Sequence, residues 1–162
     1  MKLSTNFLKD YVDIDVDVKT LAEDMTKAGN EYDSAENLIN ATNLVIGEVL
    51  ECEMHPDSDH LHVCKVNVGN EVLQIVCGAP NVRTGLKVIV ALVGAKLPGG
   101  VTIRKGNIRG VESNGMMCSI AELGIEHKFL TDADKNGIHE LPANAVPGED
   151  PIKFMQMDDS VI

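Results

Sequence analysis

The spacing of apolar residues changes near residue 40. Before that point it is helical and predicts two short helices, the first capped by Ser4 or Asn6 and the second by Asp17. Gly29-Asn30 ends the second helix, and the apolar stripe of the first consists of Phe7, Leu8, Tyr11 and Val12. Residues 1–40 hold too few apolar groups for a core of their own, so we expect them to pack on something else.

From residue 44 the apolar positions alternate, which is typical of strands. Gly47, in the first strand, predicts a bend or bulge there. A helical turn is expected over 118–123, ending at Gly124. Short, closely spaced strands with one small helix favour a compact five-stranded barrel of the OB type over a layered α/β fold. The predicted strands are 44–53, 61–68, 72–77, 87–92, 101–103, 108–111 and 137–141.

The composition limits which residues can build the core and which cellular locations are expected. Hydrophobic residues make up 44% of the chain and aromatic residues 3%, with no Trp, so Val, Ile, Leu and Met must build the core. No apolar run approaches the roughly 20 residues that span a bilayer. The first residues lack the apolar segment of a signal peptide. We therefore expect a cytoplasmic protein that does not contact a membrane.

The four cysteines are widely spaced and form no CxxC pair, which favours free, mostly buried thiols over disulfides. One group of residues invites comparison with a zinc site. Three of its members would point the same way along a strand and spread over about 13 Å, whereas tetrahedral ligation needs convergence. We therefore predict no metal site, but a polar loop followed by a strand with a buried thiol. The group is Cys52, His55, His60, His62 and Cys64.

The charge is unevenly distributed. The net charge of -11 argues against nucleic acid as a partner, but it comes from residues 1–40 and 121–162. Residues 41–120 are neutral overall, and no acid occurs between Glu71 and Glu112. That acid-free stretch carries only basic charges, at Arg83, Lys87, Lys96, Arg104, Lys105 and Arg109. An acidic chain therefore contains a wholly basic segment, residues 72–111.

Four blocks within residues 55–124 resemble the tRNA-binding OB domain. The first is His55-Pro56-Asp57-Ser58-Asp59-His60-Leu61-His62-Val63-Cys64-Lys65-Val66 and the second is Gln74-Ile75-Val76-Cys77-Gly78-Ala79-Pro80-Asn81-Val82. The third is Gly94-Ala95-Lys96-Leu97-Pro98-Gly99-Gly100. The fourth is Ile108-Arg109-Gly110-Val111-Glu112-Ser113-Asn114-Gly115-Met116-Met117-Cys118-Ser119, followed by Glu122-Leu123-Gly124.

The same domain type occurs in free-standing tRNA-binding proteins and as an appendage of methionyl-tRNA synthetase. The first forty residues decide between these settings. Residues 3–12 and 21–29 resemble the start of the bacterial phenylalanyl-tRNA synthetase β subunit. The resemblance implies an N-terminal fragment in which an OB barrel, 41–151, is inserted into a small, incomplete α+β domain. That domain would comprise residues 1–40 and the start of a return segment, 152–162.

The resemblance also implies an α2β2 phenylalanine–tRNA ligase that uses ATP and Mg²⁺ and has tRNA, not DNA, as its partner. Its catalytic and editing sites lie outside this fragment, so no catalytic residue and no bound cofactor are expected here. The residues agree, since the sequence has no Walker-type phosphate loop, no GxSxG motif and no acid pair that stands out.

We predict that the barrel binds the RNA backbone through phosphate contacts. Because aromatics are scarce, shape and charge readout is favoured over base stacking. The alternative for the charged residues is an ordinary solvated surface. For Ser113 the alternative is a turn with Gly115 at positive φ and Met117 in the core. The predicted RNA-binding residues are Lys87, Lys96, Arg104, Lys105, Arg109 and Ser113.

Asn81 is interpreted as a turn residue that satisfies local backbone. Three functions remain open for the chain as a whole. It is a tRNA-binding module of a synthetase subunit, an architectural domain without RNA contact, or a free-standing tRNA chaperone. The first forty residues argue against the chaperone, and the net charge favours the architectural role over the binding role.

Overall fold

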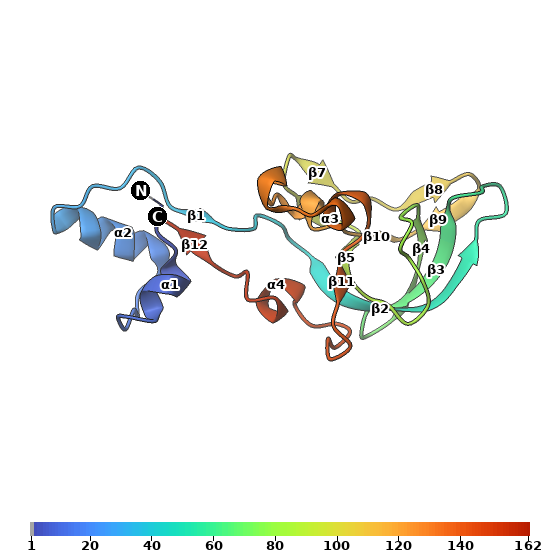
Figure 1. The fold of residues 1–162 in the computed structure, drawn as a ribbon, viewed down its shortest axis with the longest axis horizontal. Coiled ribbons are helices and arrows are strands. Elements are labelled where there is room, and N and C mark those ends of the chain that lie inside the picture. The colour runs from blue at the N-terminus through green and yellow to red at the C-terminus, as the bar shows by residue number, and fades with distance from the viewer. Residues whose placement is uncertain (1) are drawn as a thin grey trace. The chain divides into compact units, whose positions relative to one another are not determined.

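The computed structural model describes residues 2–162, which form two compact units (Figure 1). One unit is the continuous stretch 40–155. The other combines residues 2–39 with residues 156–162, so both ends of the chain contribute to it. Within residues 2–162, no helix has the length and apolar character needed to cross a membrane.

The unit of residues 40–155 is a nearly closed antiparallel barrel of five strands, which confirms the predicted fold class. The strands follow the order β10-β5-β2-β3-β4, and the short β11 (Glu140–Leu141) also pairs with β5. Three hydrogen bonds link β4 to the β9–β10 segment: Asn114 N–H to the Gln74 carbonyl at 2.8 Å, Val76 N–H to Ser113 Oγ at 3.1 Å, and the Gln74 side-chain amide to the Glu112 carbonyl at 2.8 Å. The five strands are β2 (Leu44–Met54), β3 (His62–Asn67), β4 (Val72–Cys77), β5 (Lys87–Leu92) and β10 (Gly115–Met117).

The alternating pattern places one face of each strand in the core. In β3, Cys64 and Val66 are buried while their neighbours are only half-buried. β5 is buried over most of its length, because it pairs with β2 and with both β10 and β11. The core is aliphatic and sulfur-rich, as the composition required. Its members include Val49, Cys64, Val66, Ile75, Val88, Val90, Met117 and Ile138.

Gly47 has a packing role rather than the predicted bulge. A Cβ at this position would lie 2.7 Å from side-chain atoms of both Val66 and Val90. Only glycine lets β2 lie this close to its neighbours. The irregularity of β2 lies further along, where the register with β3 shifts between Val49 and Glu51.

Two small hairpins extend from the barrel: β6 (Lys96–Leu97) with β7 (Val101–Thr102), and β8 (Gly106–Ile108) with β9 (Val111–Ser113). The second corrects the predicted strand 108–111, which was wrong. Arg109 and Gly110 have φ angles of 49° and 86°, so they form the two-residue turn of a hairpin. Apolar residues at both ends of this turn gave it the appearance of a continuous strand.

Short helices connect the last strands. The 3-10 turn η1 (Ala121–Leu123) ends at Gly124 with φ 89°, which confirms the predicted helical turn. Met117 is buried and Gly115 has φ 153°, as the alternative interpretation of that block expected. Three further helices were not predicted: η2 (His127–Phe129), α3 (Asp132–Asn136) and α4 (Pro151–Phe154).

The second unit contains both predicted helices. α1 (Thr5–Lys9) is capped by the Ser4 hydroxyl, and α2 (Val18–Lys27) by the Asp17 carboxylate. The strands β1 (Glu36–Asn37) and β12 (Ser160–Val161) pair antiparallel. The Asp159 carboxylate accepts hydrogen bonds from Ser4 Oγ (2.5 Å), Thr5 Oγ1 (3.0 Å), Asn6 N–H (2.9 Å) and Ser160 N–H (2.8 Å). One carboxylate thus joins the two ends of the chain.

Candidate nucleic-acid interface

Two of the predicted RNA-binding residues are exposed cations at the β6–β7 hairpin. Lys96 lies on β6, where its main chain is fixed by reciprocal hydrogen bonds with Thr42 at 3.0 Å. Arg104 follows β7 directly after the buried Ile103. Within residues 2–162, neither side chain forms an ion pair. Both charges are therefore available to an anionic partner.

Lys105 directly precedes β8, and Arg109 lies in the turn of the β8–β9 hairpin. The Lys105 ammonium pairs with the Glu112 carboxylate at 2.6 Å, and this hydrogen bond and charge lower the Glu112 pKa. Arg109 stands in the hairpin turn and donates from one guanidinium nitrogen to the Asp57 carbonyl at 2.9 Å. That contact leaves the remaining donors of the exposed guanidinium free for other groups.

Lys87 and Ser113 are engaged inside the barrel structure. The Lys87 ammonium lies 3.4 Å from the Glu48 carboxylate, and its side chain is only 15% exposed. Ser113 is 5% exposed; its hydroxyl accepts from Val76 N–H and donates to the Gly115 carbonyl at 3.3 Å. These contacts give both residues a structural role in the barrel. Direct RNA contact by either one stays a prediction.

The six residues do not form one cluster. Figure 1 shows β7 and the β8–β9 hairpin at different ends of the barrel. Lys96 lies on the β6–β7 hairpin and Arg109 in the turn of the β8–β9 hairpin, while the consecutive residues Arg104 and Lys105 lie in the short segment between β7 and β8. The cations of the basic segment are therefore spread from one hairpin to the other.

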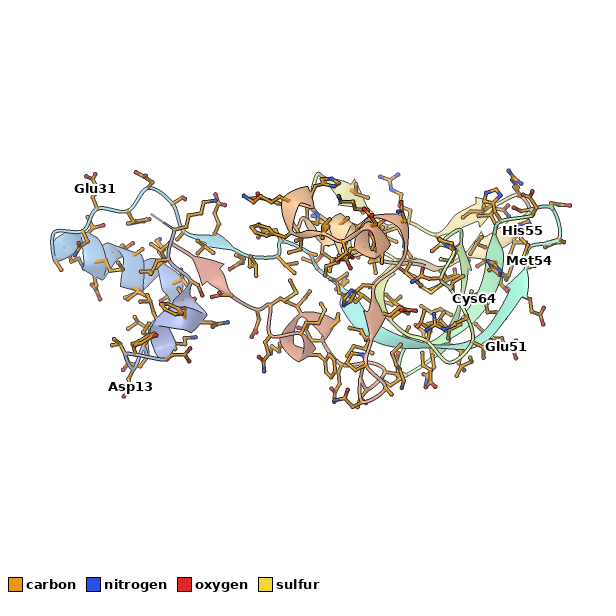
Figure 2. The ribbon with its side chains drawn as sticks, viewed as in Figure 1. Asp13, Glu31, Glu51, Met54, His55 and Cys64 are labelled. Carbon is orange, nitrogen blue, oxygen red and sulfur yellow. The ribbon has the colours of Figure 1, made fainter. Side chains whose placement is uncertain are left out.

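His55 has a role that the sequence did not reveal. It follows β2 beside the β8–β9 hairpin (Figure 2) and is 2% exposed. Its Nδ1 accepts from Asp57 N–H at 3.0 Å, so Nε2 carries the proton and donates to the Ile108 carbonyl at 2.9 Å. One ring thus holds the 55–59 loop against the hairpin. The buried imidazole has no signal in the sequence, because loop histidines are usually exposed.

The cysteines and histidines that invited comparison with a zinc site do not converge as the ligands of a metal ion would. Cys52 and Cys64 face each other across β2 and β3, with their sulfurs 3.7 Å apart as free thiols. Burial is the main cause that raises the Cys64 pKa. In residues 2–162, no three His, Cys, Asp or Glu side chains are grouped to hold a metal ion.

A pocket of about 310 Å³ opens between the end of β4 and β10. Its walls come from 76–79, from Met116 and Met117, and from 135–138. Asn81 anchors the wall formed by 135–138. Its side-chain amide donates to the Ile138 carbonyl (2.8 Å) and accepts from the Ile138 N–H (3.1 Å). The expectation that the Asn81 side chain satisfies local backbone was wrong, because its partner Ile138 lies far along the chain.

Comparisons with known proteins identify the barrel. A family model described as "Putative tRNA binding domain" matches residues 44–150. The chain belongs to this family. It is also 49% identical over its whole length to the phenylalanine–tRNA ligase β subunit of Streptococcus pneumoniae strain R6, and 48% identical to that of Shewanella oneidensis. It is homologous to the N-terminal region of this subunit and spans 20% of these relatives' length.

Among solved structures, this member of the tRNA-binding domain family is similar to a MetRS-related protein from Pyrococcus horikoshii. The sequence identity is 21% and the TM-score 0.44, over 65% of this chain and 84% of that chain. The recognition of the β-subunit family from the four blocks and the first forty residues is confirmed by the full-length matches.

Proposed function

We propose that the chain is the tRNA-binding module of a phenylalanine–tRNA ligase β subunit and contacts RNA phosphates through exposed cations of residues 72–111. The single observation that carries this proposal is the family match over the barrel. The geometry adds Lys96 and Arg104, which are exposed and unpaired within residues 2–162, and Arg109 in a hairpin turn. No Asp or Glu occurs between Glu71 and Glu112, so no acid close in the sequence opposes the charges of Lys96 and Arg104.

The parent enzyme would be an ATP- and Mg²⁺-dependent ligase that joins phenylalanine to its tRNA as an α2β2 assembly. In this proposal the chain supplies tRNA contact and architecture, while catalysis belongs to other parts of the assembly. Residues 1–40 and 152–162 would then be pieces of one discontinuous domain around the barrel, 41–151. The tie between the chain ends through Asp159 supports that arrangement.

A salt titration of tRNA binding tests the proposal. Each phosphate neutralised contributes a slope of roughly -0.7 to -0.9 in log K against log salt. We expect a slope of several units, and a reduction of about one unit for each of Lys96→Gln and Arg104→Gln. Lys153→Gln, an exposed cation outside residues 72–111, is the matched control and should leave the slope unchanged.

An architectural domain without RNA contact is the second candidate. The net charge of -11 favours it, and so do the carboxylate partners of Lys87, Lys105 and Arg83. Under this alternative, tRNA binding would be undetectable at low salt, or the salt slope would be the same for Lys96→Gln, Arg104→Gln and the control Lys153→Gln. Either result would refute the proposed contact.

A further inference from the structure

Phe129 is an exposed aromatic ring in a barrel almost without aromatics. Its relative exposure is 70%, the highest among large apolar residues of residues 40–155. The other Phe, Tyr or Trp of that unit is Phe154, which is only half-buried and lies on α4. Exposing a ring of this size forfeits the stabilisation that burial would bring. Most of the ring surface is therefore accessible to a binding partner.

Local main-chain hydrogen bonds hold the backbone that carries the ring. Phe129 ends η2, where its N–H donates to the Glu126 carbonyl at 3.0 Å and the next N–H donates to the His127 carbonyl at 3.1 Å. Two residues later, Thr131 begins α3 with a reciprocal capping box. The ring thus stands on a short hydrogen-bonded turn that leads into the capped helix α3.

A cation lies over this ring. The Lys128 ammonium is 4.9 Å from the ring centroid and 2.7 Å from the Glu126 carboxylate. A cation over one face leaves the opposite face open to a second planar group. Within residues 2–162, the ring has no aromatic partner, since the one ring pair there joins Phe7 and Tyr11.

The ring belongs to a segment that touches the β6–β7 hairpin. Gly124, which ends η1, lies against Pro98 in the hairpin turn, and a Cβ there would be 3.2 Å from the proline ring. Lys96 is on the strand that enters this turn, and its charge is unpaired within residues 2–162. An aromatic face and a free cation thus occur on two contacting segments.

We propose that Phe129, with Lys128, is a stacking platform for one unpaired base of the bound tRNA, a role that rests on the proposed function. Every nucleobase has a planar face that stacks on an aromatic ring, and the adjacent phosphate is anionic. Lys96, which is unpaired within residues 2–162, matches that charge, whereas the Lys128 charge is already paired with Glu126. The sequence alone favoured charge readout because aromatics are few, but one exposed ring is sufficient for one base.

Tryptophan fluorescence tests the contact directly, because the chain has no Trp. Phe129→Trp puts a single fluorophore at the proposed platform, and a base stacked on it quenches its emission. Tyr11→Trp is the matched control, since Tyr11 is 73% exposed but lies in the other unit. Titration with an unmodified tRNA transcript should quench the emission of the Phe129→Trp variant and leave that of the Tyr11→Trp variant nearly unchanged. Equal behaviour of the two would overturn the proposal.

Affinity measurements separate stacking from other roles of the ring. Phe129→Ala and Phe129→Leu should each weaken tRNA binding roughly tenfold, while Phe129→Tyr should keep wild-type affinity. The slope against salt should stay unchanged in all three, because no phosphate contact is removed. If Phe129→Leu bound tRNA with wild-type affinity, an apolar side chain without an aromatic face would be sufficient at this position, as on a surface covered by another protein segment. That result would overturn the stacking platform. It would leave the proposed function intact, whereas absence of any tRNA binding would defeat both.

Discussion

In the unit of residues 40–155, apolar side chains from every strand of the barrel meet in one core, whereas the other unit has few buried side chains. The buried residues of the smaller unit are Thr5, Ala22 and Ile39. Its main long-range contacts are polar, with Asp159 at their centre. The barrel is thus stabilised by burial, and the smaller unit by hydrogen bonds between the chain ends.

The two units also differ in the exposure of their apolar side chains. Phe7, Tyr11 and Val12 are 55%, 73% and 60% exposed, although they form the apolar stripe expected of the first helix. In the barrel the corresponding faces of the strands are buried. The expectation that residues 1–40 pack on something else stays a prediction, and this exposed stripe is the surface that such packing would cover.

The largest effect is expected from the barrel core. Ile75→Ala removes a fully buried side chain of β4 and should lower the free energy of unfolding of the barrel by about 2–5 kcal/mol. Val72→Ala, on the same strand but 53% exposed, should change it by less than about 0.5 kcal/mol. Hydrogen exchange resolved by segment would measure both. If protection in residues 2–39 fell as much as in the barrel, the two units would not be independent.

A smaller effect should follow from the buried polar contact of the barrel. His55→Ala leaves the Ile108 carbonyl and the Asp57 N–H without this partner and should cost about 1–3 kcal/mol. The loss should appear first as faster exchange in the β8–β9 hairpin. His60→Ala, at an exposed neighbouring position, is the control. Similar exchange in both variants would mean that His55 does not hold the hairpin.

The polar centre of the smaller unit gives the next effect. Asp159→Ala removes the acceptor of four hydrogen bonds, including those to the start of α1, and should cost about 1–2 kcal/mol. We expect exchange to rise in α1 and β12 while the barrel keeps its protection. Asp158→Ala changes an exposed neighbour and controls for loss of charge. Equal effects of the two variants would contradict the role of Asp159.

The strands of the barrel could be predicted from the sequence because their signals come from residues close together in the chain. Strands β4 and β5 have the predicted bounds, since alternation or a continuous apolar run together with flanking turn residues determines both. The predicted caps Ser4 and Asp17 are also present, because capping depends on residues within one turn. The β8–β9 turn was missed because arginine rarely adopts positive φ and therefore gives no turn signal.

The candidate site was less predictable, because it depends on contacts between distant segments. The acid-free run placed Lys96 and Arg109 in one set, but hairpin geometry separates them. The burial of Ser113 follows from its bond to Val76 N–H, across the seam of the barrel. The scarcity of aromatics argued against base stacking, and the exposure of Phe129 on η2 could not be seen from that count.

Acid should affect the two units unequally, and this is the smallest of the expected effects. Burial alone would raise the Asp159 pKa, but hydrogen bonds from Ser4, Asn6 and Thr5 outweigh it and hold the pKa below its ordinary value of 3.8. A carboxyl with a lowered native pKa contributes stability above pH 3.8 that is lost as the pH falls through the native value. The hydrogen bond from Thr20 lowers the pKa of Asp17, in the same unit, in the same direction.

We therefore expect acid to raise hydrogen exchange in α1 and β12 below about pH 4 before it affects the barrel core, which contains no carboxylate. The carboxyls of the barrel unit with a lowered pKa, Asp59, Glu112 and Asp134, lie outside that core. Asp159→Asn serves as a control, because it mimics the uncharged carboxyl at any pH. The variant at pH 6 should resemble the wild-type unit in acid, and its further response to acid should be weaker. If the wild-type unit kept full protection at pH 3, or if the barrel opened first, the polar tie through Asp159 could not be what distinguishes the smaller unit from the barrel.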